Sequence, residues 1–208
     1  ATTSGSQNTA IGQNALTNLT VNHNNVAVGY YAGQDVIGEN NVVLGSYAAY
    51  DAGDIDHCIV IGRSAMQGDG STAPSGNYNI AIGSYSLDAT TSGHSNVAIG
   101  YQAGTAIIGG QENVLIGHQA GDIMTNNNYN VAIGSGSMGA ANSGEGKNIA
   151  IGYATLATEV SGSDGCVAIG HQALEDQNVA DANNTAVGGY AALNLTSGTD
   201  SVYVGYLA

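Results

Sequence analysis

The chain has 208 residues, of which 32 are Gly, and it contains one Pro, two Cys, no Trp and no Phe. Arg63 and Lys147 are its only Lys or Arg residues, and with 16 acidic residues they give a formal net charge of −14. A nucleic-acid-binding face needs clustered basic residues to neutralise phosphates, so this composition excludes nucleic acid as a partner. No apolar run approaches the ~20 residues of a membrane span, and we expect no insertion into a bilayer.

A short block of sequence recurs twelve times along the chain, and its clearest copies read Asn-Val-Ala-Ile-Gly, as at 96–100 and 130–134. The glycine of each copy falls at Gly12, Gly29, Gly45, Gly62, Gly83, Gly100, Gly117, Gly134, Gly152, Gly170, Gly188 and Gly205. These glycines lie 16 to 21 residues apart, with a mean spacing of 17.5. Because the copies cover nearly the whole chain, we predict one repeat domain over 1–208, interpreted as a fragment of a longer chain.

The three residues before each glycine predict a short strand. In chain order the expected strands cover 9–11, 26–28, 42–44, 59–61, 80–82, 97–99, 114–116, 131–133, 149–151, 167–169, 185–187 and 202–204. Their first and third residues are mostly β-branched and share one face, while the central residue, mostly Ala, points to the other. Since all three positions are apolar, we expect one face to line the interior and the Ala face to pack against a neighbouring chain.

Each strand is followed by the glycine, which permits a corner with positive φ, and by a small residue three positions later. Each repeat therefore reads as strand, corner, short second strand and variable polar loop. The period is shorter than the ~33 to 47 residues of common helical repeats, and the Asn-Gly pairs of hairpin arrays are absent. We predict an all-β parallel β-solenoid, or β-roll, of twelve coils that forms a rod roughly 55 Å long. So thin a rod buries few large side chains per coil, which favours a homotrimer as the closed assembly.

Asn stands directly before most of the expected strands, where stacked side chains can hydrogen-bond along the rod as a ladder. Cys58 and Cys166 take this position in the fourth and tenth copies. Six coils separate them by roughly 29 Å, whereas a disulfide needs Cα atoms within ~7 Å. We expect both to be free, buried thiols.

Tyrosines cluster one or two positions after the corner glycine, on the outside of the rod or at a chain interface. Two hypotheses stay open for them. They stack on the sugars of a host glycan, or they pack between chains with their hydroxyls at the solvent-exposed rim of the interface. They are Tyr30, Tyr31, Tyr47, Tyr85, Tyr101, Tyr153, Tyr190 and Tyr206. His118 and His171 share this position but lie about 14 Å apart in the stack, too far to bind one metal ion at ~2.1 Å.

The longest insertion, at 67–78, holds the only Pro and is a candidate binding loop through Asp69, Ser71, Thr72, Pro74 and Tyr78. The alternative is a neutral bulge. Glycoside hydrolysis would need two carboxylates held in a groove; Asp54 and Asp56 are close enough in sequence, but such pairs occur by chance. No calcium-binding repeat, phosphate loop or nucleophile elbow is present. We predict no catalysis, no metal site and no cofactor.

The block resembles the head repeats of YadA-type trimeric adhesins and, more closely, the repeat stretches of bacteriophage tail fibres. The matching segments are 184–188, 100–104 and 170–174. The adhesin repeat is usually shorter, richer in Ala and poorer in Tyr, which favours the phage side. The resemblance implies a left-handed parallel β-roll with three chains around an axis. It also implies a virion or cell-surface location and a role in reaching or gripping a cell through a glycan or protein.

These expectations describe a structural, non-enzymatic segment, the shaft or receptor-reaching part of a phage tail fibre. Two alternatives remain open: the head of a bacterial trimeric surface adhesin and the subunit of a self-assembling extracellular filament. An ice-binding solenoid would need a flat array of Thr at one repeat position, and Thr is scattered among the loops here.

Overall fold

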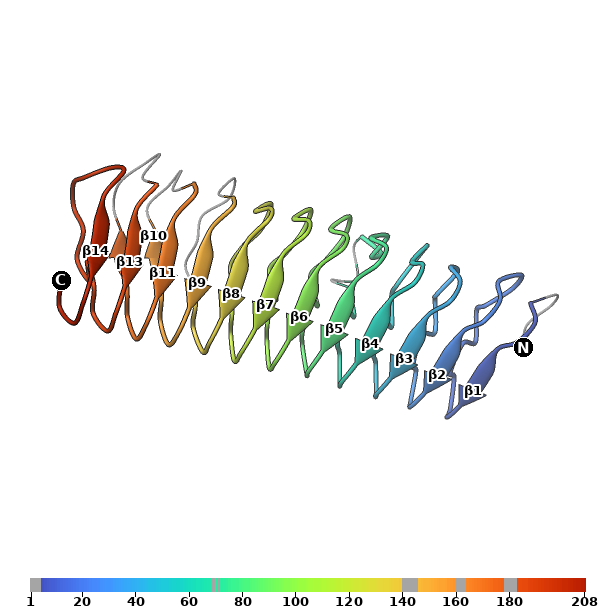
Figure 1. The fold of residues 1–208 in the computed structure, drawn as a ribbon. Helices are drawn as coiled ribbons and strands as arrows, with labels where there is room; N and C mark the ends of the chain where they lie inside the picture. Colours follow the sequence, from blue (N-terminus) through green and yellow to red (C-terminus); the bar gives the residue numbers. More distant parts are fainter. Residues whose placement is uncertain (1–4, 69, 71, 140–145, 160–163, 178–182) are drawn as a thin grey trace.

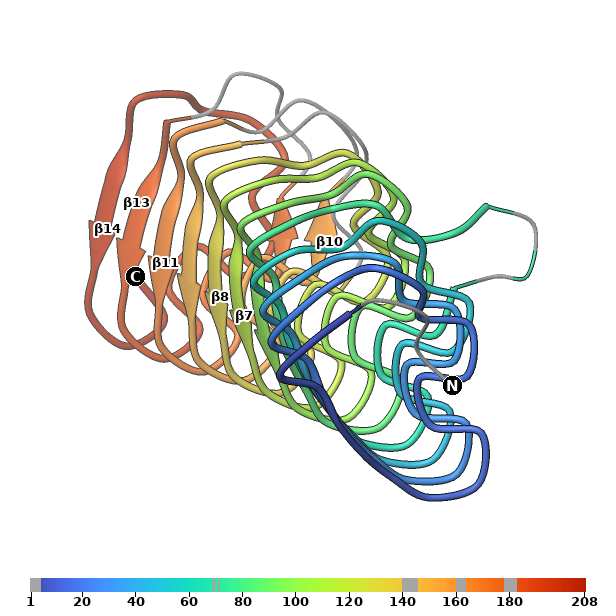
Figure 2. The same ribbon diagram turned by 90° about the vertical axis from the view of Figure 1, so that its right-hand side faces the viewer.

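The computed structural model describes residues 5–68, 70, 72–139, 146–159, 164–177 and 183–208. Their architecture is all-β, a parallel β-solenoid in which each sequence repeat contributes one strand to a single sheet (Figure 1). The successive coils stack into a rod, which Figure 2 shows from nearer its end. Within the described residues there is no helix with the length and apolar character needed to cross a bilayer.

The twelve strands of the sheet coincide with the twelve segments predicted from the repeat. They are β1 (Thr9–Ile11), β2 (Val26–Val28), β3 (Val42–Leu44), β4 (Ile59–Ile61), β5 (Ile80–Ile82), β6 (Val97–Ile99), β7 (Val114–Ile116), β8 (Val131–Ile133), β9 (Ile149–Ile151), β11 (Val167–Ile169), β13 (Thr185–Val187) and β14 (Val202–Val204). Every pair is parallel and keeps the repeat in register, so that Ala98 stands beside Leu115 and Ala132 beside Ala150. The predicted fold class is confirmed.

The expected second strand in every repeat is wrong. Within the described residues, strands outside the main sheet are limited to β10 (Thr158–Glu159) and β12 (Asp176–Gln177), which pair with each other. Elsewhere the segment after the glycine adopts turns in which alternate residues are left-handed, as at Tyr47 (φ 58°) and Ala49 (φ 46°). Such alternation is incompatible with an extended strand, although hydrogen bonds between coils persist through this segment.

The two faces of the sheet are the reverse of the prediction. The central residue of each strand points into the rod, and Ala98, Ala132 and Ala150 are fully buried. The first and third residues point outward and are partly or largely exposed. The expectation that the Ala face contacts a neighbouring chain is therefore wrong. Large side chains from the turns after the glycines, such as Leu87 and Ile107, are fully buried in the same core. They leave room mainly for small side chains at the strand centres.

Where a larger side chain enters this interior, glycines make room for it. Leu115 replaces the usual Ala at the centre of β7 and is fully buried. A Cβ built on Gly104 would lie 2.9 Å from Leu115 Cδ1, and one on Gly121 would lie 2.9 Å from Leu115 Cδ2. The interior is therefore packed by compensation between adjacent coils, as close-packed cores require.

The corner glycines form a column with almost no space between coils. Their φ values lie between 133° and 144°, a region that side chains with a Cβ rarely adopt. A Cβ on Gly117 would also lie 2.4 Å from the carbonyl oxygen of Gly134 in the next coil. Both the backbone conformation and the stacking distance therefore require glycine, as the sequence predicted.

Candidate functional site

The buried Asn ladder predicted from the sequence is present in the structure. Asn41 Nδ2 donates to Asn25 Oδ1 at 3.0 Å, and the same contact joins Asn113 to Asn96 at 3.0 Å. In each step the backbone N–H of the later residue donates to that same oxygen. These side chains are fully buried and hydrogen-bonded, so the ladder is a structural element rather than a ligand site.

The two cysteines interrupt this ladder; both are buried and neither forms a disulfide, as expected. The backbone N–H of Cys58 still donates to Asn41 Oδ1 at 2.9 Å, and its thiol donates to the carbonyl oxygen of Gly76 in the next coil at 3.5 Å. A thiol offers no amide oxygen to the next ladder residue, and Asn79 Nδ2 instead donates to the Gly76 carbonyl oxygen at 3.0 Å. Burial raises the pKa of Cys58 to about 11, so this thiol is protonated near neutral pH and poorly nucleophilic.

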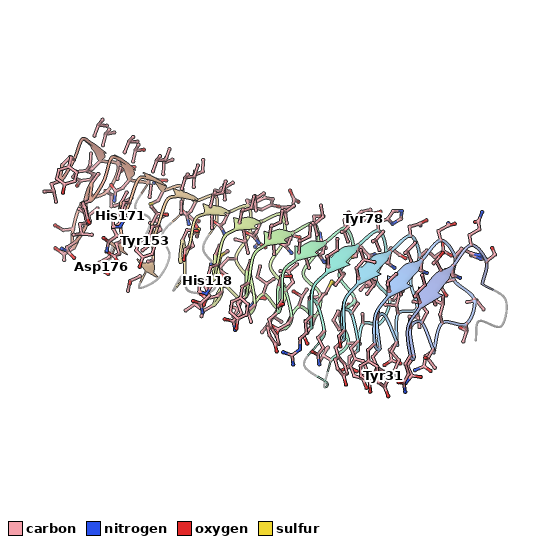
Figure 3. The ribbon with its side chains drawn as sticks, turned by 90° about the horizontal axis from the view of Figure 1, so that it is seen from below. Tyr31, Tyr78, His118, Tyr153, His171 and Asp176 are labelled. Carbon is pink, nitrogen blue, oxygen red and sulfur yellow. The ribbon has the colours of Figure 1, made fainter. Side chains whose placement is uncertain are left out.

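The outward side chains of the main sheet form a continuous apolar surface, which we call the outer strip. It comprises the first and third residues of the twelve strands, and 22 of these 24 side chains are aliphatic, with Thr9 and Thr185 as the exceptions. Figure 3 shows side chains standing outward along the row of strands. Ile59, Ile149 and Ile169 are 36 to 37% exposed although they lie within the stack.

The outer strip is as large as the largest apolar patch that a typical soluble monomer exposes. Twelve strands at ~4.8 Å and three residues at ~3.3 Å give a plan area of roughly 500 Å². The largest apolar patch on a typical soluble monomer is about 300 to 600 Å² and often marks an interaction site. The strip carries no charged residue, whereas the column that flanks it before the Asn ladder includes Glu112, Lys147 and Asp200. An apolar centre with a polar rim is the usual anatomy of a protein interface.

All eight predicted tyrosines lie on the surface, partly or fully exposed, and the register brings them together in three groups. Tyr30, Tyr31 and Tyr47 form one group with Tyr50. Tyr85 and Tyr101 form the second with His118, and Tyr153, Tyr190 and Tyr206 form the third with His171. Tyr50 was not predicted, because it lies five residues after its glycine. The turn at Tyr47 and Ala49 brings it to Tyr31 and Tyr47, and the repeat pattern gives no signal of that contact.

The structure describes only part of the insertion at 67–78, and its role as a binding loop stays a prediction. Asp69 and Ser71 lie outside the described residues, so that part of the prediction stays untested. Thr72 is exposed, but Pro74 is buried and its carbonyl oxygen accepts a hydrogen bond from Gly53 N at 2.9 Å. Tyr78 stacks on His57 of the preceding coil at 5.1 Å between ring centroids. Figure 3 shows Tyr78 and Tyr31 at opposite edges of the rod.

Among the carboxylates, Asp56 has a structural role. Its Oδ1 accepts a hydrogen bond from the backbone N–H of Glu39 at 2.7 Å, which joins two coils. Burial raises the pKa of Asp88 to about 6 and also raises the pKa of Asp122. These two side chains lie two coils apart, roughly 10 Å along the stack. Across the described ranges, no three His, Cys, Asp or Glu side chains gather as a metal site.

Comparison with known proteins adds no relative: no protein-family model, curated protein or solved structure matches this chain. The fold class rests on the structure itself. Any function must be argued from the outer strip and the aromatic groups, the two surfaces that the register builds from many coils.

Proposed function

We propose that this chain is a structural segment of an extended fibre, which works through its length and stiffness and assembles with copies of itself. The observation that carries the proposal is the outer strip, an apolar surface that runs the full length of the sheet. Burying apolar surface contributes about 25 cal/mol per Å², so a strip of this size strongly favours a state in which it is covered.

A second copy of the chain is the occupant that fits this surface best. The strip repeats once per coil, and only a partner with the same repeat can match it along its whole length. Its lack of charged residues also lets copies approach without burying the carboxylates that give each chain its net charge of −14. Closed assemblies leave no strip uncovered, and the resemblance to trimeric fibres favours three chains around an axis.

The same resemblance supports the biological role as the shaft or receptor-reaching part of a phage tail fibre, located on a virion. The head of a bacterial trimeric adhesin at the cell surface is the alternative with the same architecture. A filament that grows end to end is a further alternative, and it differs in producing an open series of sizes. In all three the work of the segment is mechanical, and the proposal includes no catalytic step.

Sedimentation velocity at several concentrations tests the proposal. The chain has a mass of 20.7 kDa, and we expect one elongated species of about 62 kDa. The variant Ile116→Lys places a charge in the middle of the outer strip and should dissociate the assembly into monomers. Ile108→Lys is the matched control, because Ile108 is 46% exposed outside the strip.

Three results would contradict the proposal. They are a 20.7 kDa monomer for the unmodified chain, an assembly that Ile116→Lys leaves intact, and equal dissociation by Ile108→Lys. A series of sizes that grows with concentration would replace the closed trimer by the filament.

A further inference from the structure

The first aromatic group joins two adjacent coils of the rod. Tyr30 and Tyr31 follow β2, whereas Tyr47 and Tyr50 follow β3. Tyr47 contacts Tyr30 at 5.3 Å and Tyr31 at 5.5 Å between ring centroids. Tyr31 also contacts Tyr50 at 5.5 Å. We call these four residues the tyrosine cluster. Three of its ring pairs therefore cross from one coil to the next.

The other two aromatic groups offer fewer and longer contacts of this kind. In the second group, Tyr85 and Tyr101 form one pair at 6.1 Å between centroids. In the third group a histidine lies between Tyr153 and Tyr190, at 5.1 and 5.0 Å from them, and Tyr190 meets Tyr206 at 5.8 Å. Phenol rings of adjacent coils therefore meet most closely and most often in the tyrosine cluster.

One member of the tyrosine cluster is open to a reagent in solution. Tyr30 is 41% exposed, so a surface oxidant can remove the hydrogen atom of its hydroxyl. Its ring contacts Tyr31 at 4.4 Å and Tyr47 at 5.3 Å between centroids. A radical formed on Tyr30 is therefore in contact with phenol rings of both coils. Because an exposed side chain can turn without disturbing the packed interior, these rings can also reorient to form a bond.

We propose that the tyrosine cluster is a site of oxidative cross-linking, at which a haem peroxidase with hydrogen peroxide joins a tyrosine of the β2 coil to one of the β3 coil as dityrosine. Each of the two phenols loses the hydrogen atom of its O–H bond. The two phenoxyl radicals then form a C–C bond between carbons ortho to their oxygens. The hydrogens on these carbons move to the oxygens, which restores both phenols. Hydrogen peroxide takes up the two hydrogen atoms removed and leaves as two water molecules.

The cross-link adds a covalent bond where the two coils are otherwise held by weaker contacts. At this point the backbone N–H of Tyr47 donates to the Tyr30 carbonyl oxygen at 2.9 Å. A bond between the side chains closes a loop of about one coil and lowers the conformational entropy of the unfolded chain, as a disulfide does. The cross-linked rod should therefore resist separation of these coils. The inference does not depend on assembly, because both rings belong to one chain.

Treatment of the folded, intact chain with a plant haem peroxidase and hydrogen peroxide tests this inference. The single-chain fraction is isolated under denaturing conditions and cut with glutamyl endopeptidase. Glu39 separates the two halves of the cluster, because fragment 1–39 holds Tyr30 and Tyr31 as its only tyrosines and fragment 40–112 holds the other half. We expect dityrosine fluorescence and a species in which the two fragments stay joined, with a mass two hydrogen atoms below their sum.

The double variant Tyr47→Phe/Tyr50→Phe keeps both rings and removes both phenols of the β3 coil, so the joined fragments should be lost. Tyr85→Phe/Tyr101→Phe is the matched control, because it removes two phenols from the same fragment but outside the cluster. Its yield of joined fragments should equal that of the unmodified chain. Circular dichroism before the reaction shows that both variants are folded.

Tyr78 also belongs to fragment 40–112, but it lies at the edge of the rod opposite Tyr31 (Figure 3), so joined fragments report the cluster. The purified cross-linked chain should unfold at a higher temperature than the double variant treated in the same way. The inference is overturned if the folded chain gives no joined fragments, if the bonds form only between different chains, or if the double variant joins its fragments as well as the unmodified chain. A cross-linked chain that unfolds no later would remove the stabilising role.

Discussion

Asn113 Nδ2 donates to Asn96 Oδ1 at 3.0 Å, and Asn113 Oδ1 in turn accepts from Asn130 Nδ2 at 3.2 Å. The same Oδ1 accepts the backbone N–H of Asn130 at 3.0 Å. One buried amide thus joins three successive coils. Because its partners are themselves buried, each depends on it for hydrogen bonds that water cannot replace.

Replacing Asn113 with Ala should lower the free energy of unfolding by about 2 kcal/mol or more, since it leaves buried polar groups without partners. Denaturant unfolding followed by circular dichroism measures this loss. Asn126→Ala, an exposed asparagine in the neighbouring loop, should cost less than about 0.5 kcal/mol. Equal effects of the two substitutions would show that the ladder adds nothing specific.

The corner glycines allow a matched comparison within one chain. Gly205→Ala meets only backbone strain, because the nearest atom to its added Cβ is Ala208 Cβ at 3.8 Å; we expect a loss of about 1 to 3 kcal/mol. Gly117→Ala has the same strain and also a clash at 2.4 Å with the Gly134 carbonyl oxygen. Its midpoint of thermal unfolding should therefore fall much further. Similar midpoints for the two variants would argue against close stacking of the glycine column.

Thr90 is a buried polar residue whose side chain is poorly satisfied. It is fully buried, and its Oγ1 has no hydrogen-bond partner within the described residues. Thr90→Val keeps the shape and removes the unpaired hydroxyl, so stability should rise by about 1 kcal/mol. Thr155→Val should have the opposite effect, because Thr155 Oγ1 donates to the Gly152 carbonyl oxygen at 3.3 Å. A loss of stability in Thr90→Val would contradict this assignment.

Asp88 should make the rod less stable as the pH rises through about 6. Burial raises its pKa in the folded chain to about 6 from an ordinary 3.8, so the folded state binds more protons than the unfolded state between these values. Stability is then highest near the lower value and falls as the pH rises to 6 and just above. Since Asp88 is only half-buried, solvent screening reduces the effect to about 1 kcal/mol.

The variant Asp88→Asn isolates this contribution, because it carries no charge at any of these pH values. It should be more stable than the unmodified chain at pH 7 and nearly equal to it at pH 4, as measured by chemical denaturation at both. Asp54→Asn, at an exposed position, serves as the control. A constant difference between Asp88→Asn and the unmodified chain across this range would contradict the prediction.

The strands, their register and the corner glycines were predictable because each follows from the repeat alone. A residue type that recurs every 17 or so positions, such as the Ile of Ile99 and Ile116, reports a shared position in a stacked coil. The direction in which that position points is a different matter. Alternation separates two faces but does not say which is inward, and the larger side chains were assigned to the interior by default. The deciding feature is that the turns send large side chains such as Ile107 and Met124 into the core. This becomes visible only once the turns after Gly100 and Gly117 are known.

Those turns were misread for a related reason. Tyr47 and Ala49 have strand-compatible neighbours in sequence, and nothing in their residue type signals left-handed φ values. The conformation is imposed by the stack, since both residues donate backbone hydrogen bonds to adjacent coils. The aromatic group of Tyr30, Tyr31 and Tyr47 was only partly predicted, because Tyr50 joins it through the conformation of the turn after Gly45.

The three-residue strands run across the rod, so the hydrogen bonds that join coil to coil lie along its length. A pull on the two ends would load these bonds one coil at a time, and the rod would open step by step, as a zipper does. Compression and bending instead press the glycine column and the packed interior together, where almost no free space remains. A single chain of this design resists compression and bending better than tension. Tensile strength would have to come from neighbouring chains that lie alongside it.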